Sequence, residues 1–364
     1  MKIRNAVITC VALSAFAISP WATAQSYTVK ALGPSDAAWV YAAAINNNGQ
    51  VVGEYDGLPF ITGANGVGWT NLSTLGVETD PQGINNSGQV VGQYATATYG
   101  VRSFITAANG VGISEIPSLQ GIFSRGIAIN DSGQVTGFYA SGPSQTLHAF
   151  ITGPSGLGLT DLGTFGGISS SGVDINSNGQ VLAQYDIDRH NNRRSVITGP
   201  NGVGYTELAP EAIGFALNDS GQVVGRLRED PESGDYQAFI TGVNGAGLTI
   251  IDTLVGGSFT LARDINASGQ VVGQVHFDGV PHAFVTGANG VGMIDLNSFA
   301  GFSNGDYFEE AWGINDAGQI LVQSLFGHAY LLTPTNPVPE PETYAMMLAG
   351  LGLLGVMTRR RKQA

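Results

Sequence analysis

The sequence predicts an all-β protein: a seven-bladed β-propeller of four-stranded blades, with the ring closed by the N-terminal strand. Three observations support this fold. A unit of about 45 residues occurs seven times, each unit holds four short β-type segments between Gly- and Asn-rich turns, and the last unit lacks one segment that the N-terminus supplies. Only 12% of the residues are charged and glycine occurs 53 times. This composition is typical of many short strands joined by tight turns.

The N-terminal segment 1–24 is predicted to be a secretory signal peptide. Two basic residues precede the apolar run 6–18, and Ala22 and Ala24 form a small-x-small cleavage signal. Cleavage is expected after Ala24. Because Cys10 is the only cysteine in the chain, the mature protein is expected to have no disulfide bond and no cysteine metal ligand.

The charge of the remaining chain is strongly negative. Without the six basic residues of the two terminal segments, nine basic residues stand against 28 acidic ones, a net charge near −19, and Lys30 is the only lysine left. A surface of this sign repels phosphate backbones, so nucleic acid is not expected as a partner.

The repeat is marked by the dipeptide Gly-Gln. Its seven copies are Gly49-Gln50, Gly88-Gln89, Gly133-Gln134, Gly179-Gln180, Gly221-Gln222, Gly269-Gln270 and Gly318-Gln319. An apolar stretch that ends in Asn precedes each copy. Val-Val-Gly or a variant follows it, and most units continue with "AFITG" and "NGVG". A repeat of this spacing indicates a solenoid, a propeller or an array of small domains.

Each unit is predicted to form four strands. The Asn/Asp/Ser-Gly turn joins the first two, and a second Gly/Asn-rich turn joins the last two, which is the pattern of successive hairpins. No part of the repeats shows a sustained helical period. Four strands per 45 residues or so is the size of a propeller blade, whereas solenoid coils are usually shorter.

The two ends of the repeat region complete each other. The seventh unit runs through "HAYLLTP", residues 328–334, and stops before its fourth strand, while "SYTVKALGP", residues 26–34, resembles an isolated fourth strand. Pairing these segments completes seven blades and removes the exposed sheet edges of an open stack. The predicted propeller domain is 25–336.

The phrases "HAFITG", "DLGTFGG" and "NDSGQVVG" resemble the HAF-repeat family of extracellular bacterial proteins. The resemblance extends over residues 26–334. Unit four departs from it with "RSVITG", which lacks the aromatic residue of the third strand. The resemblance implies a secreted β-repeat protein and brings no reaction or ligand with it.

The C-terminus has a different composition. Residues 337–343 are a Pro- and Glu-rich linker, and residues 344–364 hold a short apolar run, predicted to be helical, that ends in a basic cluster. The apolar run 344–357 is shorter than the roughly 20 residues of a full membrane span. Its basic end is expected on the cytoplasmic side.

This order resembles the PEP-CTERM sorting signal. The residues that carry the resemblance are Pro339, Glu340 and Pro341, then the apolar helix, then Arg359, Arg360, Arg361 and Lys362. It implies a Gram-negative exporter, often one that makes exopolysaccharide, and an exosortase-type enzyme that removes the tail. The protein would be exported through the inner membrane and held there by the C-terminal helix. After processing it would reach the outer cell surface or the extracellular space.

Three histidines precede the aromatic residue of the third strand: His148, His282 and His328. They suggest either a metal site or a structural position. Equivalent positions in different blades are related by rotation about the ring axis and do not converge on the outer strands. A structural role is therefore expected, with no metal and no cofactor.

The Asn that ends the first strand occurs in all seven units: Asn46, Asn85, Asn130, Asn176, Asn218, Asn266 and Asn315. Asp131, Asp219 and Asp316 follow it in three units, and Asn, Ser or Ala in the others. Exchange among these types suits a turn and not a catalytic acid. The terminal Glu of an EF-hand calcium loop is also missing.

The links between strands two and three, and between blades, vary in sequence and are expected to share one face. Tyr55, Tyr94, Tyr139 and Tyr185 end second strands and approach this face, where they either pack in the fold or stack on sugar rings. Arg189, His190 and Arg193 lie in one of its charged loops, either as a solvated loop or as part of a site.

No catalytic motif is present, so we expect a non-catalytic binding or structural protein of the cell surface or extracellular matrix, associated with exopolysaccharide or a surface glycan in a biofilm. The alternative is a polysaccharide lyase or hydrolase with its site on the variable face, because propellers also host such sites.

Overall fold

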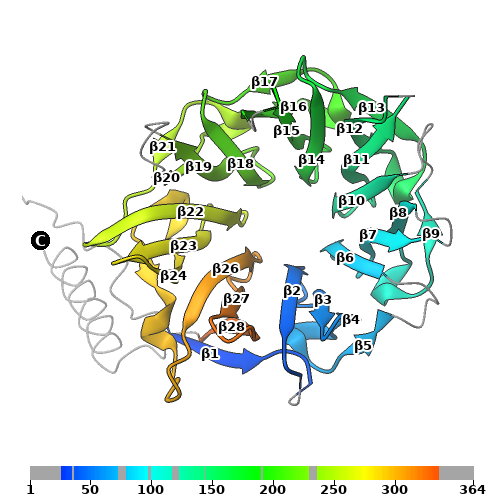
Figure 1. Ribbon diagram of the computed structural model, residues 1–364. Coiled ribbons are helices and arrows are strands. Elements are labelled where there is room, and N and C mark those ends of the chain that lie inside the picture. The colour runs from blue at the N-terminus through cyan, green and yellow to red at the C-terminus, as the bar shows by residue number, and fades with distance from the viewer. Residues whose placement is uncertain are drawn as a thin grey trace, which may run out of the picture. The chain divides into compact units, whose positions relative to one another are not determined.

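The computed structural model describes residues 26–34, 37–72, 79–96, 100–116, 123–142, 144–189, 192–228 and 236–335. The predicted signal peptide with Ala22 and Ala24, His190, and the sorting segment 337–364 lie outside the described residues. Seven four-stranded antiparallel sheets are arranged in a ring (Figure 1), and their first strands line a central channel. The predicted seven-bladed propeller is thereby confirmed.

The blades are numbered one to seven from β2 onward, and each begins with the strand nearest the channel. The first strands are β2 (Val40–Ile45), β6 (Thr79–Ile84), β10 (Ser124–Ile129), β14 (Ser169–Ile175), β18 (Ala212–Leu217), β22 (Gly257–Ile265) and β26 (Phe308–Ile314). The second strands are β3 (Val51–Tyr55), β7 (Val90–Ala95), β11 (Val135–Ser141), β15 (Val181–Asp186), β19 (Val223–Arg228), β23 (Val271–Phe277) and β27 (Ile320–Ser324).

Farther out, the third strands are β4 (Leu58–Ile61), β8 (Val101–Ile105), β12 (Thr146–Thr152), β16 (Arg193–Thr198), β20 (Tyr236–Ile240), β24 (Val280–Val285) and β28 (Ala329–Thr335). The fourth strands are β5 (Thr70–Asn71), β9 (Ser114–Glu115), β13 (Leu159–Gly163), β17 (Tyr205–Glu207), β21 (Thr249–Ile250), β25 (Ile294–Asp295) and, in the last blade, β1 (Ser26–Ala31).

Short 3₁₀ turns are the only helical elements among the described residues. Six of them join third to fourth strands, at Ala64–Gly66, Ala108–Gly110, Pro154–Gly156, Pro200–Gly202, Val243–Gly245 and Ala288–Gly290, and a seventh is Leu296–Phe299. No helix in these ranges is long and apolar enough to cross a membrane. The predicted apolar helix, 344–357, lies outside them.

The N-terminal strand closes the ring as the sequence predicts. The last sheet has the order β1-β28-β27-β26, so the first strand in the chain becomes the fourth strand of blade seven. The Leu32 N–H donates to the Ala329 carbonyl oxygen at 2.9 Å, and the Thr28 hydroxyl reaches the Thr333 carbonyl oxygen at 3.4 Å. The two ends of the repeat region are therefore held in one sheet.

Every first strand carries an irregularity in its pairing with the second strand, as between Gly126 and Ala128 of β10. This bulge brings the first strand close to the glycine of the Val-Val-Gly phrase. A Cβ atom on Gly137 would lie 1.9 Å from the Arg125 carbonyl oxygen. A glycine is therefore needed at this close backbone approach in five blades, whereas blades four and seven accommodate Ala183 and Val322 at the same position.

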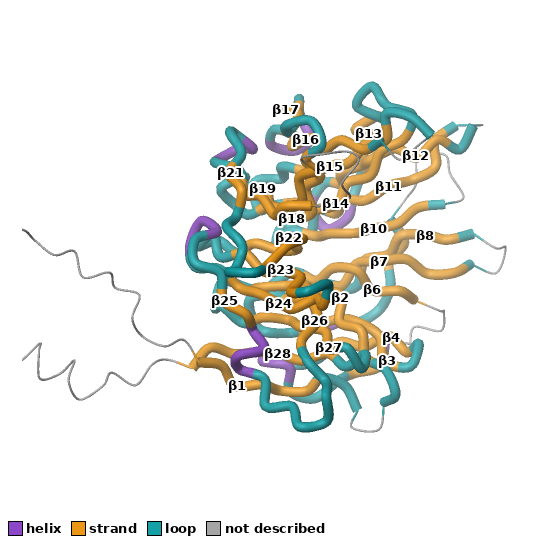
Figure 2. Tube along the Cα trace, turned by 60° about the vertical axis from the view of Figure 1, so that its left-hand side comes forward, coloured by secondary structure: helices purple, strands orange, loops and turns teal. Residues whose placement is uncertain are grey.

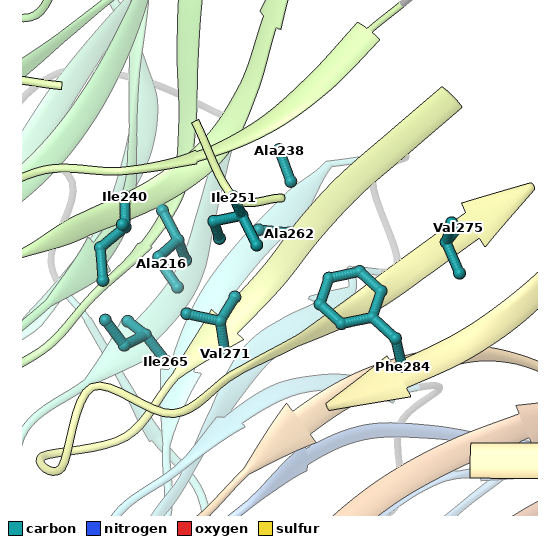
Figure 3. Close-up of a cluster of buried hydrophobic side chains, with 10 residues drawn as sticks. Ala216, Ala238, Ile240, Ile251, Ala262, Ile265, Val271, Val275 and Phe284 are labelled. Atoms are coloured by element: carbon teal, nitrogen blue, oxygen red, sulfur yellow. The ribbon is translucent and has the colours of Figure 1, made fainter. Parts of the chain in front are cut away.

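The core is divided into seven apolar clusters, one at each interface between neighbouring blades. Figure 3 shows the cluster between blades five and six, where Ile240 and Ile251 pack against Val271 and Phe284. The third-strand phenylalanines of the other typical units are also fully buried: Phe60, Phe104, Phe150 and Phe239. Because each cluster draws on two blades, no blade buries its apolar surface alone.

The two faces of the ring differ, and Figure 2 shows the blades from the side. The turns between strands one and two lie against the 3₁₀ turns between strands three and four. In blade one, the Asn65 N–H donates to the Asn48 carbonyl oxygen at 3.0 Å, and the Gly66 N–H to that of Gly49 at 2.8 Å. We call this side the turn face. The opposite side, with the links between strands two and three and between blades, is the loop face.

Candidate functional site

The repeated Asn residues form a closed ring of hydrogen bonds on the turn face. Each side-chain Nδ2 donates to the backbone carbonyl oxygen of the equivalent Asn in the next blade, at 2.8 to 3.2 Å. The last of these bonds, from Asn315 to Asn46, returns to the first blade. Seven copies of one contact therefore join all seven blades.

The other bonds of each Asn hold its own turn. The Oδ1 atom of Asn130 accepts the Gln134 N–H at 3.0 Å, and its Nδ2 also donates to Gln134 Oε1 at 2.9 Å. The Asn–Gln pair has the same form in every unit. These buried side chains have their hydrogen-bonding capacity used within the fold, so the phrase stabilises the ring.

The variable residue after the Asn also links neighbouring blades. Asp131 accepts the Asn86 N–H at 2.9 Å and the Asn86 side-chain amide at 2.7 Å. Asp219 and Asp316 accept the N–H groups of Ser177 and Ala267 in the same manner. The three carboxylates are turn residues that also bridge blades.

The channel opens on the turn face as a cavity of about 380 Å³ lined by the first strands. Asp174 and Asp264 belong to its wall. Each accepts two backbone N–H groups, one of its own strand and one of the next blade, from Leu217 and Ile314 respectively, both at 2.8 Å. Burial raises the pKa of Asp174 to about 7 and that of Asp264 to about 6, although both side chains remain partly accessible through the channel.

The histidines of the third strands lie in separate blades, each beside its own fourth strand. His148 Nδ1 contacts the Asp161 carboxylate at 2.9 Å, and His282 Nδ1 contacts that of Asp295 at 2.8 Å. His328 is half-buried in blade seven. Among the residues that the structure describes, no three His, Cys, Asp or Glu side chains lie close enough together to hold a metal ion.

The four tyrosines named from the sequence lie at the ends of second strands, and three of them are buried. Tyr139 is 1% exposed, Tyr185 5% and Tyr55 8%, so they present little surface to a ligand. The Tyr185 hydroxyl donates to Glu207 at 2.5 Å, and the half-buried Tyr94 donates to Glu115 at 3.1 Å.

The charged loop of blade four is only partly described. Arg189 is exposed, and His190 lies outside the described residues. Arg193 lies at the start of β16, where its Nε pairs with Asp186 Oδ1 at 3.0 Å and its guanidinium donates to Gln184 at 3.2 Å. The structure therefore places Arg193 in a groove beside blade five, and the grouping of Arg193 with His190 falls outside the described residues.

A chain of aromatic and arginine contacts runs from Trp39 on the loop face into the channel wall and spans blades one, seven, six and five. Trp39 and Tyr41 lie parallel, with ring centroids 6.0 Å apart, and Tyr41 meets Trp312 edge-on at 5.8 Å. The Arg263 guanidinium lies 4.4 Å from the Trp312 ring and 5.5 Å from that of Phe215. Such cation–π contacts stabilise by about 0.5–2 kcal/mol each.

At one end of this chain is a groove of about 260 Å³ between blades seven and one, which we call the tryptophan groove. Its lining includes Trp39, which is 41% exposed, with Trp312 and the carboxylates Glu309 and Glu310. Burial raises the pKa of Glu310, and its Oε1 accepts the Arg263 Nε at 2.5 Å. The groove thus combines flat aromatic surface with hydrogen-bonding groups.

Trp39, Trp312 and Arg263 were not identified as site residues from the sequence. A usable indication exists three positions before the repeated Asn, where each unit has a different residue: Ala43, Gln82, Ile127, Val173, Phe215, Arg263 and Trp312. All seven line the channel. The variation at this position of an otherwise similar phrase therefore identifies the side chains by which the channel wall differs from blade to blade.

Comparison with known proteins supports the sorting signal and the fold. Residues 337–362 match the family profile of the PEP-CTERM protein-sorting motif. No curated protein matches the chain significantly.

Two solved structures share the architecture at low identity. The β-propeller domain of the Trilobed protease from Pyrococcus furiosus, described as having an open velcro topology, matches with a TM-score of 0.53 and 11% identity over 79% of this chain and 90% of that one. The Pyrococcus horikoshii acylaminoacyl peptidase matches with a TM-score of 0.52 and 9% identity over 81% of this chain. This chain covers only 51% of the peptidase.

Identities this low show the fold alone. The sorting motif adds what the fold does not: the chain is a β-propeller protein that carries a PEP-CTERM motif, which indicates export and exosortase sorting to the cell surface.

Proposed function

We propose that this exported propeller is a non-catalytic glycan-binding protein of the cell surface, and that its sugar site is the tryptophan groove on the loop face. The observation that carries the proposal is the exposed Trp39, which lies parallel to Tyr41 and beside Trp312 in a groove with Glu309 and Glu310. Flat aromatic rings match the apolar C–H faces of pyranose sugars, and neighbouring carboxylates accept hydrogen bonds from sugar hydroxyls.

The proposed partner is exopolysaccharide or another surface glycan, in a biofilm or matrix. The sorting motif supports this partner because it directs the protein to the surface where such polymers accumulate. The resemblance to HAF-repeat proteins belongs to the same proposal. Before processing, the C-terminal segment would also hold the protein at the inner membrane.

Binding of the purified protein to the exopolysaccharide of its own host, and to a panel of neutral and acidic glycans, tests the proposal. Trp39→Ala is expected to weaken binding roughly 5- to 150-fold, because loss of one aromatic stacking contact costs about 1–3 kcal/mol. Trp69→Ala is a matched control, since Trp69 is 44% exposed and follows the 3₁₀ turn of the turn face. Equal binding by the two variants would place the site elsewhere, and no binding to any glycan would leave only a scaffold role.

The alternative is a polysaccharide-active enzyme, a lyase or a hydrolase. Its support is the gathering of Arg193, Arg226 and Tyr236 at one groove of the loop face. In a lyase, arginines neutralise a substrate carboxylate and a tyrosine removes or returns a proton. Formation of new reducing ends or unsaturated sugars, lost on alanine substitution of Arg189, His190 and Arg193, would establish catalysis.

A further inference from the structure

A second groove of the loop face lies between blades four and five, and its lining holds four arginines and one acidic residue, Glu211. It has a volume of about 510 Å³. Arg193 and Arg194 of β16 line one wall, and Arg226 and Arg228 of β19 with Tyr236 of β20 line the other. Four of the nine basic residues of the propeller therefore gather at one interface of a strongly acidic protein. We call it the arginine groove.

The two walls differ in how their charges are neutralised. On blade four, Arg193 pairs with Asp186 at 3.0 Å and Arg194 with Glu207 at 3.5 Å. On blade five, Arg228 donates to the Tyr236 hydroxyl at 2.6 Å, which leaves its charge in place. Neither Arg226 nor Arg228 forms an ion pair with any residue in the described ranges.

Arg226 is the most isolated of these cations. Its guanidinium lies 4.2 Å from the Tyr236 ring and 5.8 Å from that of Phe215, and its buried Nε has no hydrogen-bond partner. Burial lowers the pKa of Arg226, and the positive charges of nearby arginines lower it further, against the effect of Tyr236. The Nε atom is enclosed, but the uncompensated charge of the guanidinium at the groove wall favours an anion with several acceptor oxygens.

We propose that the arginine groove binds the carboxylate of an acidic sugar, a uronic acid unit within the polysaccharide. This rests on the proposed glycan-binding function and adds the substrate class. A carboxylate can accept two parallel N–H groups from an arginine, and Tyr236 offers a ring and a hydroxyl for the sugar itself.

The overall negative charge distinguishes this ligand from nucleic acid. Duplex DNA carries one charge per about 1.7 Å of its axis, so most of its phosphates would face the acidic surface. A polysaccharide whose carboxylates are separated by neutral sugars brings one charge to the arginine groove and few to the remainder of the ring.

Matched oligosaccharides test the proposal. A galacturonate oligosaccharide is titrated into the purified protein by calorimetry, alongside the same oligosaccharide with its carboxyl groups methyl-esterified. The acid is expected to bind at least tenfold more tightly than the ester, and added NaCl should weaken only the acid. Equal affinity for the two, or equal salt dependence, would overturn the proposal.

Variants locate the binding. Arg226→Gln and, separately, Arg228→Gln are expected to weaken acid binding at least fivefold and to reduce the preference for the acid over the ester. Arg102→Gln is the control, because Arg102 pairs with Glu115 on blade two, away from the arginine groove. Using Arg228→Gln as well as Arg226→Gln covers the case in which the half-buried Arg226 variant fails to fold. An unchanged preference for the acid in a folded Arg228→Gln variant would overturn the assignment.

Two further measurements test whether another anion occupies the arginine groove. Inorganic phosphate and sulfate should compete with the acid only weakly, and competition at equal concentration would show a general anion site instead. The segment 229–235 is outside the described residues and carries Glu229, Asp230, Glu232 and Asp235. If the acid binds only after all four are changed to amides, this segment is the natural occupant and the proposal fails.

Failure here is distinguishable from failure of the proposed function. Binding of the methyl ester that is lost in Trp39→Ala would keep the glycan-binding function while removing the acidic-sugar preference. Absence of binding by either oligosaccharide and by the host polysaccharide would remove both.

Discussion

The side-chain amide of Asn315 donates to the backbone carbonyl oxygen of Asn46 at 3.0 Å, which joins residues 269 positions apart. The same bond occurs between all other neighbouring blades. Two contacts therefore close the ring. One is this hydrogen bond near the channel, on the turn face, and the other is the pairing of β1 with β28 farther out.

Asn130→Ala should destabilise the protein by about 2–4 kcal/mol, because it removes the bond to Asn176 and leaves buried groups of Gln134 without partners. Denaturant unfolding followed by tryptophan fluorescence measures the change. Asp131→Asn is the control, and it should cost less than about 1 kcal/mol, since an amide oxygen can still accept the Asn86 N–H. Similar losses in both variants would contradict the structural role assigned to the Asn ring.

Deletion of residues 26–31 should lower the melting temperature and cause aggregation. The deletion removes β1 and leaves the edge of β28 unpaired, and unpaired edges promote association between chains. Differential scanning fluorimetry and light scattering would detect both effects. If instead the shortened protein remains monomeric with an unchanged melting temperature, β1 does not contribute to closure.

Stability should fall as the pH rises toward neutrality, in part because of Asp174 and Asp264. The folded pKa of Asp174 is raised from 3.8 to about 7, so its stabilising contribution is complete below 3.8 and is lost as the pH rises through about 7. The stabilising contribution of Asp264 is lost in the same direction, as the pH rises through its folded pKa of about 6. Each pKa unit corresponds to about 1.4 kcal/mol, so the two shifts set an upper bound of about 7 kcal/mol, and the solvent access of both side chains through the channel lowers the effect below it.

The double variant Asp174→Asn/Asp264→Asn should therefore show a flatter dependence of unfolding free energy on pH, although its stability at acidic pH is lower. Asp278→Asn provides the control, because it removes one carboxylate from an exposed turn. A pH slope that is identical in the double variant and the native protein would show that these carboxyls do not titrate as assigned.

Replacement of Pro339, Glu340 and Pro341 by alanine should block processing, because it removes the motif within the matched segment 337–362. The unprocessed protein is expected in the membrane fraction, and immunoblots of cell fractions with an antibody to the propeller would show it. As a control, an alanine at Thr335, outside the motif, should leave processing intact. Normal release of the triple variant would argue against exosortase recognition.

The sequence was sufficient to predict the ring because every blade repeats the same contacts. The Asn, the glycine turn and the buried phenylalanine each occur at a fixed spacing, and the incomplete last unit indicated the role of residues 26–34. A periodic pattern reports the features that all blades share. It therefore defines the fold far better than the site.

The candidate sites depend on differences between blades, which a periodic pattern does not rank. Trp39 lies in a link before β2, and Arg226 and Tyr236 meet Arg193 only because blades four and five are neighbours. The tyrosines illustrate the converse. Their position at strand ends predicted proximity to the loop face, but the pleat directs Tyr139 and Tyr185 into the apolar clusters between blades.

The Asn ring also bears on how such a protein can change in size. Each unit presents a donor to one neighbour and an acceptor to the other, so the contact is head-to-tail and closes only if its rotation divides a full circle. Seven units satisfy that condition here. If one unit were gained by duplication or lost by deletion, every hydrogen bond of the ring could still form. The angle between neighbouring blades would have to change at each of them. The angle between neighbouring blades that this contact allows, together with the apolar clusters beside it, therefore limits how many units one ring can hold.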